Sequence, residues 1–348
     1  MEETTRMTDT FDSLLGRVSA GEDLNAGQMK AAIGQIMTGG CTAGQMGLFL
    51  TALSAKGETV AELAGAAAAM RANMTPILSR HKKLLDTCGT GGGGSTTFNI
   101  STTAALVIAA TGVPVAKHGN RSITSRSGSA DVLAGLGVNI EANVAQVERC
   151  LNELGICFCF APLMHPAMKH VSAVRKELGI RTIFNLLGPL ANPAAAQFQL
   201  LGVGRPETRP LIASALGMLG TERSFVVSGK DGLGEVTLAG TTVGTEVTPA
   251  GEREFSWEPE DFGIPRAPLD SINIAGPTDS VELVRAVLAG EPGAARDIVL
   301  LNAAAGLLVA GYSSDPRDAA DSAAQSIDSG LASDLLEKLV RLSHEPAN

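Results

Sequence analysis

The feature that most constrains this 348-residue sequence is a glycine-rich segment between a strand-like run and a helix-like run. The apolar stretch at residues 84–88 predicts a buried strand, and residues 99–111 predict a helix. Between them lies the segment GTGGGGST, at residues 89–96. Glycine lets backbone N–H groups approach an oxyanion, and a helix N-terminus adds partial positive charge. The sequence therefore predicts an anion site here, with phosphate as the first expected ligand.

Two familiar nucleotide motifs account for this loop less well. Glycines at 89, 91 and 94 satisfy the GxGxxG pattern, but a dinucleotide site also needs an acidic residue about twenty residues further on. The segment after the second strand-like run is basic instead, with the sequence KHGNRS at 117–122. A ligand phosphorylated at two ends fits these two donor clusters better than a dinucleotide. A Walker loop is excluded because no Gly-Lys-Ser or Gly-Lys-Thr triplet closes the turn.

Composition and charge narrow the class of protein further. The net charge of −9 and pI near 5.1 argue against a nucleic-acid partner, and a single Trp and a single Tyr leave few stacking platforms for bases. The N-terminus lacks the apolar core of a signal peptide, and no apolar stretch reaches the ~18 residues that cross a bilayer. We therefore expect a soluble cytoplasmic protein with no membrane partner.

Cysteine and histidine spacing gives no sign of a disulfide framework or a zinc site. The odd number of cysteines and the absence of a CxxC pair favour reduced thiols, and Cys157 and Cys159 fall in an apolar run that predicts a buried strand. No HExxH spacing is present, and a helix would place His165 and His170 on different faces. The cysteines are at 41, 88, 150, 157 and 159, and the histidines are at 81, 118, 165, 170 and 344.

Periodicity divides the chain into two parts. Residues 10–72 show apolar positions at helical spacing with glycine breaks, so we expect an N-terminal helical domain at 1–80. Residues 81–348 are expected to form a larger α/β domain with a mainly parallel central sheet flanked by helices. The segment 166–193 contains a helix that ends at Gly179, and we expect it to pack against the helical domain. The predicted strands are at 84–88, 113–117, 156–160, 198–203 and 224–228.

Six motifs occur together in one order along the chain. They are DTCGTGG at 86–92, TFNIST at 97–102, KHGNRS at 117–122, GSADVL at 128–133, HPAMKHV at 165–171 and RTIFNLLGPL at 181–190. In this combination they resemble the anthranilate phosphoribosyltransferase family over about residues 15–335. The resemblance implies a homodimer whose active site lies between a small helical domain and an α/β domain. It also implies Mg²⁺-dependent transfer of phosphoribose from 5-phosphoribosyl 1-diphosphate (PRPP) to anthranilate, in tryptophan biosynthesis.

The resemblance also assigns the donor site, without a covalent nucleophile. Ser101 and Glu235 are expected to meet Mg²⁺, and the stretch from Lys117 to Ser125, with Ser129, is expected to close over PRPP as a mobile loop. Helix capping is the alternative role for any one of the serines and threonines. The expected donor residues are Gly89, Gly92, Gly93, Thr97, Asn99, Ile100, Ser101, Thr102, Lys117, His118, Gly119, Asn120, Arg121, Ser122, Ile123, Thr124, Ser125 and Ser129.

For the acceptor, the resemblance implies an arginine that holds the anthranilate carboxylate. Arg175 fills this role, because its guanidinium can donate two parallel hydrogen bonds to one carboxylate. The alternative is a solvated helix arginine that pairs with Glu177. His118 is either a catalytic group on the acceptor path or a loop histidine whose ring nitrogens are hydrogen-bonded within the protein. The expected acceptor residues are Gly89, Asn120, Arg175 and Pro189.

Two acidic positions of the family pattern are glycine in this chain. The family usually has Asp after Gly-Thr-Gly-Gly, where this sequence has Gly93, and an Asp-Glu pair where this sequence has Gly234 and Glu235. A histidine common before the second motif is replaced by Ser228. Because Mg²⁺ is commonly held by one or two carboxylates plus substrate phosphates, we expect one Mg²⁺ site to be weakened.

Three explanations of these losses stay open at this point. The chain is an anthranilate enzyme with altered magnesium dependence, a paralogue that uses another aromatic acceptor, or a homologue that binds ligand with low or no turnover. Removing carboxylates beside a diphosphate also removes repulsion, which favours the first explanation. The presence of Asn120 and Arg175 favours it as well.

Overall fold

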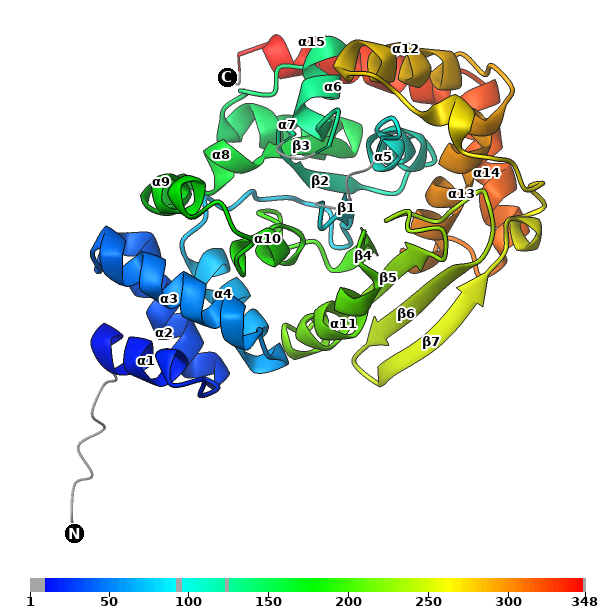
Figure 1. Cartoon of the computed structure of the whole chain (residues 1–348). Helices are drawn as coiled ribbons and strands as arrows, with labels where there is room; N and C mark the ends of the chain where they lie inside the picture. Colours follow the sequence, from blue (N-terminus) through cyan, green and yellow to red (C-terminus); the bar gives the residue numbers. More distant parts are fainter. Residues whose placement is uncertain (1–9, 92–95, 123–124, 347–348) are drawn as a thin grey trace.

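The computed structural model describes residues 10–91, 96–122 and 125–346. Its N-terminal part consists of four helices, as the periodicity predicts. Each helix begins after a polar N-cap whose side chain accepts a backbone N–H, and three of them have complete capping boxes. Their buried apolar residues belong to one cluster. The four helices lie at the lower left of Figure 1. The helices are α1 (Phe11–Ser19), α2 (Ala26–Thr38), α3 (Ala43–Lys56) and α4 (Val60–Ala72).

The α/β part is built on a seven-stranded sheet in the order β3-β2-β1-β4-β5-β6-β7. The first five strands in this order are parallel, and β6 and β7 add an antiparallel hairpin at one edge. Figure 1 shows this hairpin extending beyond α11 (Arg209–Met218). The strands are β1 (Leu85–Gly89), β2 (Val115–Gly119), β3 (Ile156–Phe160), β4 (Phe198–Gly202), β5 (Arg223–Gly229), β6 (Thr242–Thr248) and β7 (Gly251–Trp257).

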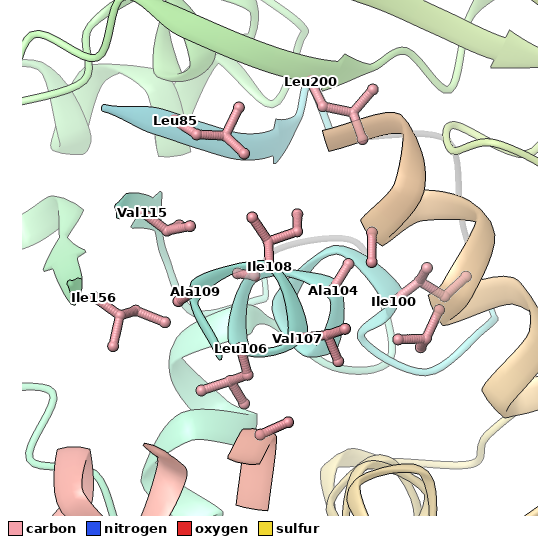
Figure 2. Packing of buried hydrophobic residues seen from close by; sticks show 14 of the residues in the cluster. Leu85, Ile100, Ala104, Leu106, Val107, Ile108, Ala109, Val115, Ile156 and Leu200 are labelled. Atoms are coloured by element: carbon pink, nitrogen blue, oxygen red, sulfur yellow. The ribbon is translucent and has the colours of Figure 1, made fainter. Parts of the chain in front are cut away.

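Helices cover the two faces of the sheet with separate apolar layers. One layer surrounds α5, whose Ile108 is directed at strand residues Leu85 and Val115, while Leu106 points away from the sheet (Figure 2). The other layer joins α11 to the four N-terminal helices. The helices on the α5 side are α5 (Ile100–Ala110), α6 (Ser129–Gly135), α7 (Val144–Leu154), α12 (Pro277–Leu288), α13 (Ala294–Val309), α14 (Pro316–Asp328) and α15 (Leu331–His344).

The strand order has a switch point between β1 and β4. From β1 the chain moves outward to β2 and β3, and it then returns to the other side of β1 to form β4 and β5. In open α/β sheets, ligands bind outside the carboxyl ends of the strands at such a point. Gly89 and Gly202 are the paired last residues of β1 and β4, so the glycine-rich loop leaves the sheet at this position.

The segment after β3 returns to the helical part. Val171 and Val174 of α9 are buried in the N-terminal apolar cluster, and α9 contacts α2 and α3. Gly179 ends this helix in the left-handed conformation, with φ 63°. The segment contains α8 (Ala161–Met164), the 3₁₀ helix η1 (Pro166–Met168), α9 (Lys169–Leu178), α10 (Phe184–Leu187) and the 3₁₀ helix η2 (Gly188–Leu190).

The predicted fold class is confirmed, and two details differ from the sequence predictions. The hairpin of β6 and β7 was not predicted. Strand β2 also lies two residues later than predicted, so Lys117 and His118 are buried strand residues and not part of a mobile loop. They are held there by pairing with Phe158 and Cys159 of β3. Within the described ranges, no helix is long and apolar enough to cross a membrane.

Candidate functional site

Residues 89–91 of the glycine-rich segment and the start of α5 lie at the switch point of the sheet. The Thr90 N–H donates to Gly202 O at 3.0 Å, which ties the loop to the end of β4. Asn99 is the N-cap of α5, but its side chain accepts no N–H of the first turn. The first turn of this helix therefore keeps N–H groups that a bound anion can use. Gly92, Gly93, Ile123 and Thr124, which were predicted to contact the donor, lie outside the described residues.

Lys117 is the buried cation of the site. It is 3% exposed, and its Nζ donates to Thr87 O at 2.6 Å and lies 3.4 Å from Ser101 Oγ. Thr87 Oγ1 in turn donates to Ser101 O at 3.0 Å, which links the end of β1 to the first turn of α5. Burial lowers the pKa of Lys117, and the nearby Asp86, Cys88 and Glu235 oppose that shift. Among the described residues Lys117 forms no ion pair with a carboxylate, so it is suited to a ligand that brings negative charge.

Glu235 faces Lys117 from the loop after β5. Removal from water raises the pKa of this carboxyl to about 7, and the charge of Lys117 acts in the opposite direction. The neighbouring Gly234 lies against backbone: a Cβ at this position would be 2.9 Å from Gly204 N. Gly202 is more tightly constrained, because a Cβ there would be 1.8 Å from Gly234 O. Glycine at 234 and 202 therefore allows the loop to approach β4 closely enough to bring Glu235 to the site.

The chain after β2 is held by a carboxylate and a serine. Asp131 accepts hydrogen bonds from the N–H groups of Ser122 and Gly128 and forms an ion pair of 3.0 Å with Arg121. Ser280 binds both the N–H and the side-chain oxygen of Asn99, at 3.0 and 2.8 Å. Arg121 and Asn99 are thus already oriented by protein partners. The predicted Asn120 and Ser129 meet as well, since Ser129 Oγ donates to Asn120 O at 3.3 Å.

His118 lies on the opposite face of the sheet from Lys117, because adjacent strand residues point to opposite faces. Its Nδ1 is 3.0 Å from Gly188 O, and its Nε2 is 3.2 Å from Nε2 of His165. Burial lowers the pKa of His118 to about 4 and that of His165 to about 3. Both rings are therefore neutral near pH 7. The structure places His118 in a strand, with both ring nitrogens in contact with protein.

Pro189 and Arg175 come from the segment that follows these histidines. Pro189 is buried, and its carbonyl accepts from Gln199 Nε2 at 2.6 Å. The Arg175 guanidinium lies over the Phe184 ring, 5.7 Å from its centroid, and burial lowers its pKa. Among the described residues Arg175 has no ion pair with a carboxylate, so the alternative pairing with Glu177 is not found. Such a half-buried, unpaired arginine can accept a carboxylate from a ligand.

Three polar residues of this region were not assigned a role from the sequence. Asp86 is fully buried in β1 and accepts the N–H of His118 at 3.2 Å, while Gln199 of β4 lies 3.4 Å from its other oxygen. His165 pairs with His118 across 47 residues of sequence. Asp86 carries a detectable signal, an acidic residue inside an apolar strand run. For Gln199 and His165, the sequence gives no sign of their partners.

The described residues do not form a metal cage of their own. No group of three or more His, Cys, Asp or Glu side chains lies close enough together in the parts of the chain that the structure describes. Ser101 and Glu235 offer one hydroxyl and one carboxylate. This set fits Mg²⁺ that arrives with a diphosphate, since Mg²⁺ keeps several waters and uses one or two carboxylates together with substrate phosphates.

Comparison with known proteins identifies both parts of the chain. Residues 12–74 match the glycosyl transferase family helical bundle domain, and residues 81–333 match the glycosyl transferase family a/b domain. The sequence is 50% identical over 336 residues to the anthranilate phosphoribosyltransferase of Trichlorobacter lovleyi, which covers 92% of this chain and 96% of that protein.

Solved structures agree with the sequence comparison. The anthranilate phosphoribosyltransferase of Thermus thermophilus has a TM-score of 0.90 and 42% identity, with coverage of 95% of this chain and 99% of that one. The Saccharomyces cerevisiae enzyme, in complex with PRPP and Mg, has a TM-score of 0.88 and 28% identity, with coverage of 96% and 97%.

Proposed function

Because this chain belongs to the anthranilate phosphoribosyltransferase family, we propose that it transfers the phosphoribosyl group of PRPP to anthranilate, giving N-(5-phosphoribosyl)anthranilate and diphosphate. This reaction is a step of tryptophan biosynthesis. The observation that carries the proposal is the site at the switch point. There the buried Lys117, the open N-terminus of α5 and residues 89–91 of the glycine-rich segment converge, and these are donors of the kind that a diphosphate needs.

The donor half of the site stabilises a leaving group. When C1 of the ribose loses diphosphate, positive charge develops on the sugar and negative charge grows on the departing oxygens. Lys117 and the first-turn N–H groups of α5 are already oriented, so they stabilise that growing charge without rearrangement. Mg²⁺, when bound with the donor, neutralises further diphosphate charge. Asn99 and the segment held by Asp131 then border the ribose side.

The acceptor half binds a neutral amine that carries a carboxylate. We propose that Arg175 holds this carboxylate, with Asn120, Pro189 and Gly89 along the path to C1. An aromatic amine attacks through its nitrogen lone pair and needs no strong base. His118 is therefore part of the wall of the path, since its Nδ1 faces Gly188 O and its Nε2 faces His165.

The metal site of this chain uses one carboxylate where the family pattern has a pair. We propose that Glu235 meets Mg²⁺ with the Ser101 hydroxyl and the diphosphate of PRPP. Gly234 supports this single-carboxylate site, because a side chain at 234 would collide with the backbone of Gly204. The glycine is thus part of the packing of the loop. The missing aspartate is accommodated by the structure, which favours altered magnesium dependence over decay of the enzyme.

The activity is tested by mixing the purified protein with PRPP, anthranilate and Mg²⁺ and following the loss of anthranilate fluorescence. We expect turnover, and its absence across a wide range of Mg²⁺ concentrations would contradict the proposed reaction. Turnover of another aromatic acid, with none of anthranilate, would instead identify a paralogue with a different acceptor. A homodimer stays a prediction, which sedimentation of the same preparation tests.

The metal proposal has its own experiment. Isothermal titration calorimetry should detect Mg²⁺ binding in the presence of PRPP and much weaker binding without it. We expect Glu235→Gln to raise the Mg²⁺ concentration needed for half-maximal PRPP binding about tenfold, while Glu337→Gln, which changes an exposed carboxylate on α15, leaves it unchanged. Equal Mg²⁺ dependence in the wild type and Glu235→Gln would show that Glu235 does not meet the metal.

A further inference from the structure

The buried pair of His118 and His165 joins three segments that bear acceptor residues. His118 lies two residues before Asn120, Gly188 directly precedes Pro189, and His165 lies just before η1 and α9, which carries Arg175. The rings are tilted by 57° with centroids 5.0 Å apart, and both residues are less than 10% exposed. The chain of contacts from Gly188 O through His118 to His165 therefore connects the walls of the path.

The hydrogen on each ring nitrogen follows from the carbonyl at one end of this chain. A carbonyl oxygen only accepts, so Nδ1 of His118 carries the hydrogen that it donates to Gly188 O. In the neutral ring Nε2 is then a bare acceptor. The contact of 3.2 Å with His165 requires that Nε2 of His165 be the donor. One backbone oxygen thus determines the tautomer of two rings.

We propose that His165 is a positioning residue for the acceptor: by donating its Nε2–H to His118, it fixes the tautomer and orientation of the His118 ring and with them the acceptor path. This assignment rests on the proposed function for its effect on anthranilate. The Ala191 backbone also acts on the His165 ring and opposes the lowering of its pKa, but within the described residues Nδ1 has no partner at hydrogen-bond geometry, so the bond to His118 is the one of normal geometry on this ring. The donated hydrogen also occupies the His118 lone pair, which excludes His118 as the base for the amine.

Kinetics of two variants separate donation from simple filling of space. His165→Gln keeps an N–H near the position of Nε2, whereas His165→Leu fills the space without a donor. Loss of one hydrogen bond to a buried nitrogen corresponds to about a tenfold change in an equilibrium constant. We expect His165→Leu to raise the KM for anthranilate about tenfold and the KM for PRPP less than twofold. His165→Gln should stay within about threefold of the wild type for both substrates.

A surface histidine provides the matched control. His344 on α15 also contacts a carbonyl, with its Nε2 3.0 Å from Gly137 O, but it lies away from the acceptor segments. We expect His344→Gln to leave both KM values unchanged. The proposal is wrong if His165→Leu leaves the KM for anthranilate unchanged, or if it raises both KM values equally.

A spectrum of the wild-type protein tests the tautomers without substrate and without a variant. In ¹⁵N-histidine-labelled protein, the imidazole ¹⁵N shifts should show hydrogen on Nδ1 of His118 and on Nε2 of His165. The opposite pair of tautomers would overturn the assignment, whatever the activity. Absence of anthranilate turnover by the wild type would instead contradict the proposed function, so the two failures are distinguishable even if His165→Leu fails to fold.

Discussion

Lys117 and His118 are neighbours on β2, yet they enter two different chemical environments. Lys117 points toward α5 and lies among backbone and hydroxyl oxygens; burial lowers its pKa, and the nearby Glu235 opposes that shift. His118 points toward the segment that contains Gly188 and is held neutral, with a pKa lowered to about 4 by burial. One strand therefore supplies a basic amine on one face of the sheet and a neutral imidazole on the other.

The difference matches the demands of the two proposed substrates. A departing diphosphate gains negative charge as the reaction proceeds, so a buried cation stabilises the transition state more than the ground state. The acceptor amine stays uncharged until it attacks, so a cation next to its lone pair would not stabilise the reaction. The acceptor half carries its positive charge on Arg175, at the proposed position of the carboxylate.

Replacing Lys117 in the donor half should have the largest effect, and it tests whether the two faces of the strand act separately. We expect Lys117→Met to lower kcat/KM for PRPP by about 10²–10³-fold, the usual effect of losing one preorganised electrostatic donor. Direct binding of anthranilate, followed by its fluorescence, should change little. Steady-state kinetics with each substrate varied in turn provides the measurement. An equal loss of anthranilate binding would show that the two faces are not chemically separate.

Removing the charge of the acceptor half should have a smaller effect, on the other substrate. We expect Arg175→Ala to raise the KM for anthranilate about 10–100-fold, because a charged hydrogen bond contributes about 1.5–3 kcal/mol. The KM for PRPP should stay within about twofold. Lys176→Ala, which changes an exposed cation next to it on α9, is the matched control and should leave both KM values as they are. Equal effects on the two substrates would contradict the role of Arg175.

Adding a carboxylate at position 234, on the donor side of the site, should destabilise the folded protein. Gly234→Asp places a Cβ 2.9 Å from Gly204 N, and we expect the free energy of unfolding to fall by about 1–3 kcal/mol, as in other overpacked sites. A Cβ on Gly240 meets nothing within 4 Å, so Gly240→Asp tests the same chemistry in open space. Denaturant unfolding of both variants gives the comparison. Unchanged stability of Gly234→Asp would show that the loop moves freely to admit the side chain.

The acceptor half should make the protein sensitive to mild acid. His118 and His165 bind protons at pH 6.5 when unfolded but only near pH 4 and pH 3 when folded, so acidification below pH 6.5 favours unfolding. Because each of these two histidines is neutral in the folded protein, lowering the pH from 6.5 to 5.5 should reduce the free energy of unfolding by about 1 kcal/mol per histidine. We expect His165→Gln to lose about 1 kcal/mol less than the wild type over this range in denaturant unfolding. If the free energy of unfolding fell equally with pH in the wild type and in His165→Gln, His165 would be protonated in the folded protein over this range.

Local chemistry explains why so much of the fold could be predicted from the sequence. The four N-terminal helices carry their own caps and apolar spacing, and the five parallel strands are short apolar runs between helices. The hairpin of β6 and β7 was missed because Thr242–Thr248 and Gly251–Trp257 alternate with polar residues and carry no strong apolar run. The six motifs identified the family, and the comparisons confirm it.

The sequence by itself determined the strand that ends at Gly89 and the helix that begins at Ile100, because such elements depend on residues close together in the chain, and it predicted an anion site between them. The structure, not the sequence, placed Lys117 and His118 in β2, where the alternation of side chains sends them to opposite faces of the sheet. Only the tertiary structure decided what lies on each side. His165 meets His118, and Gly234 meets Gly204, through close approaches between distant segments that no local pattern encodes.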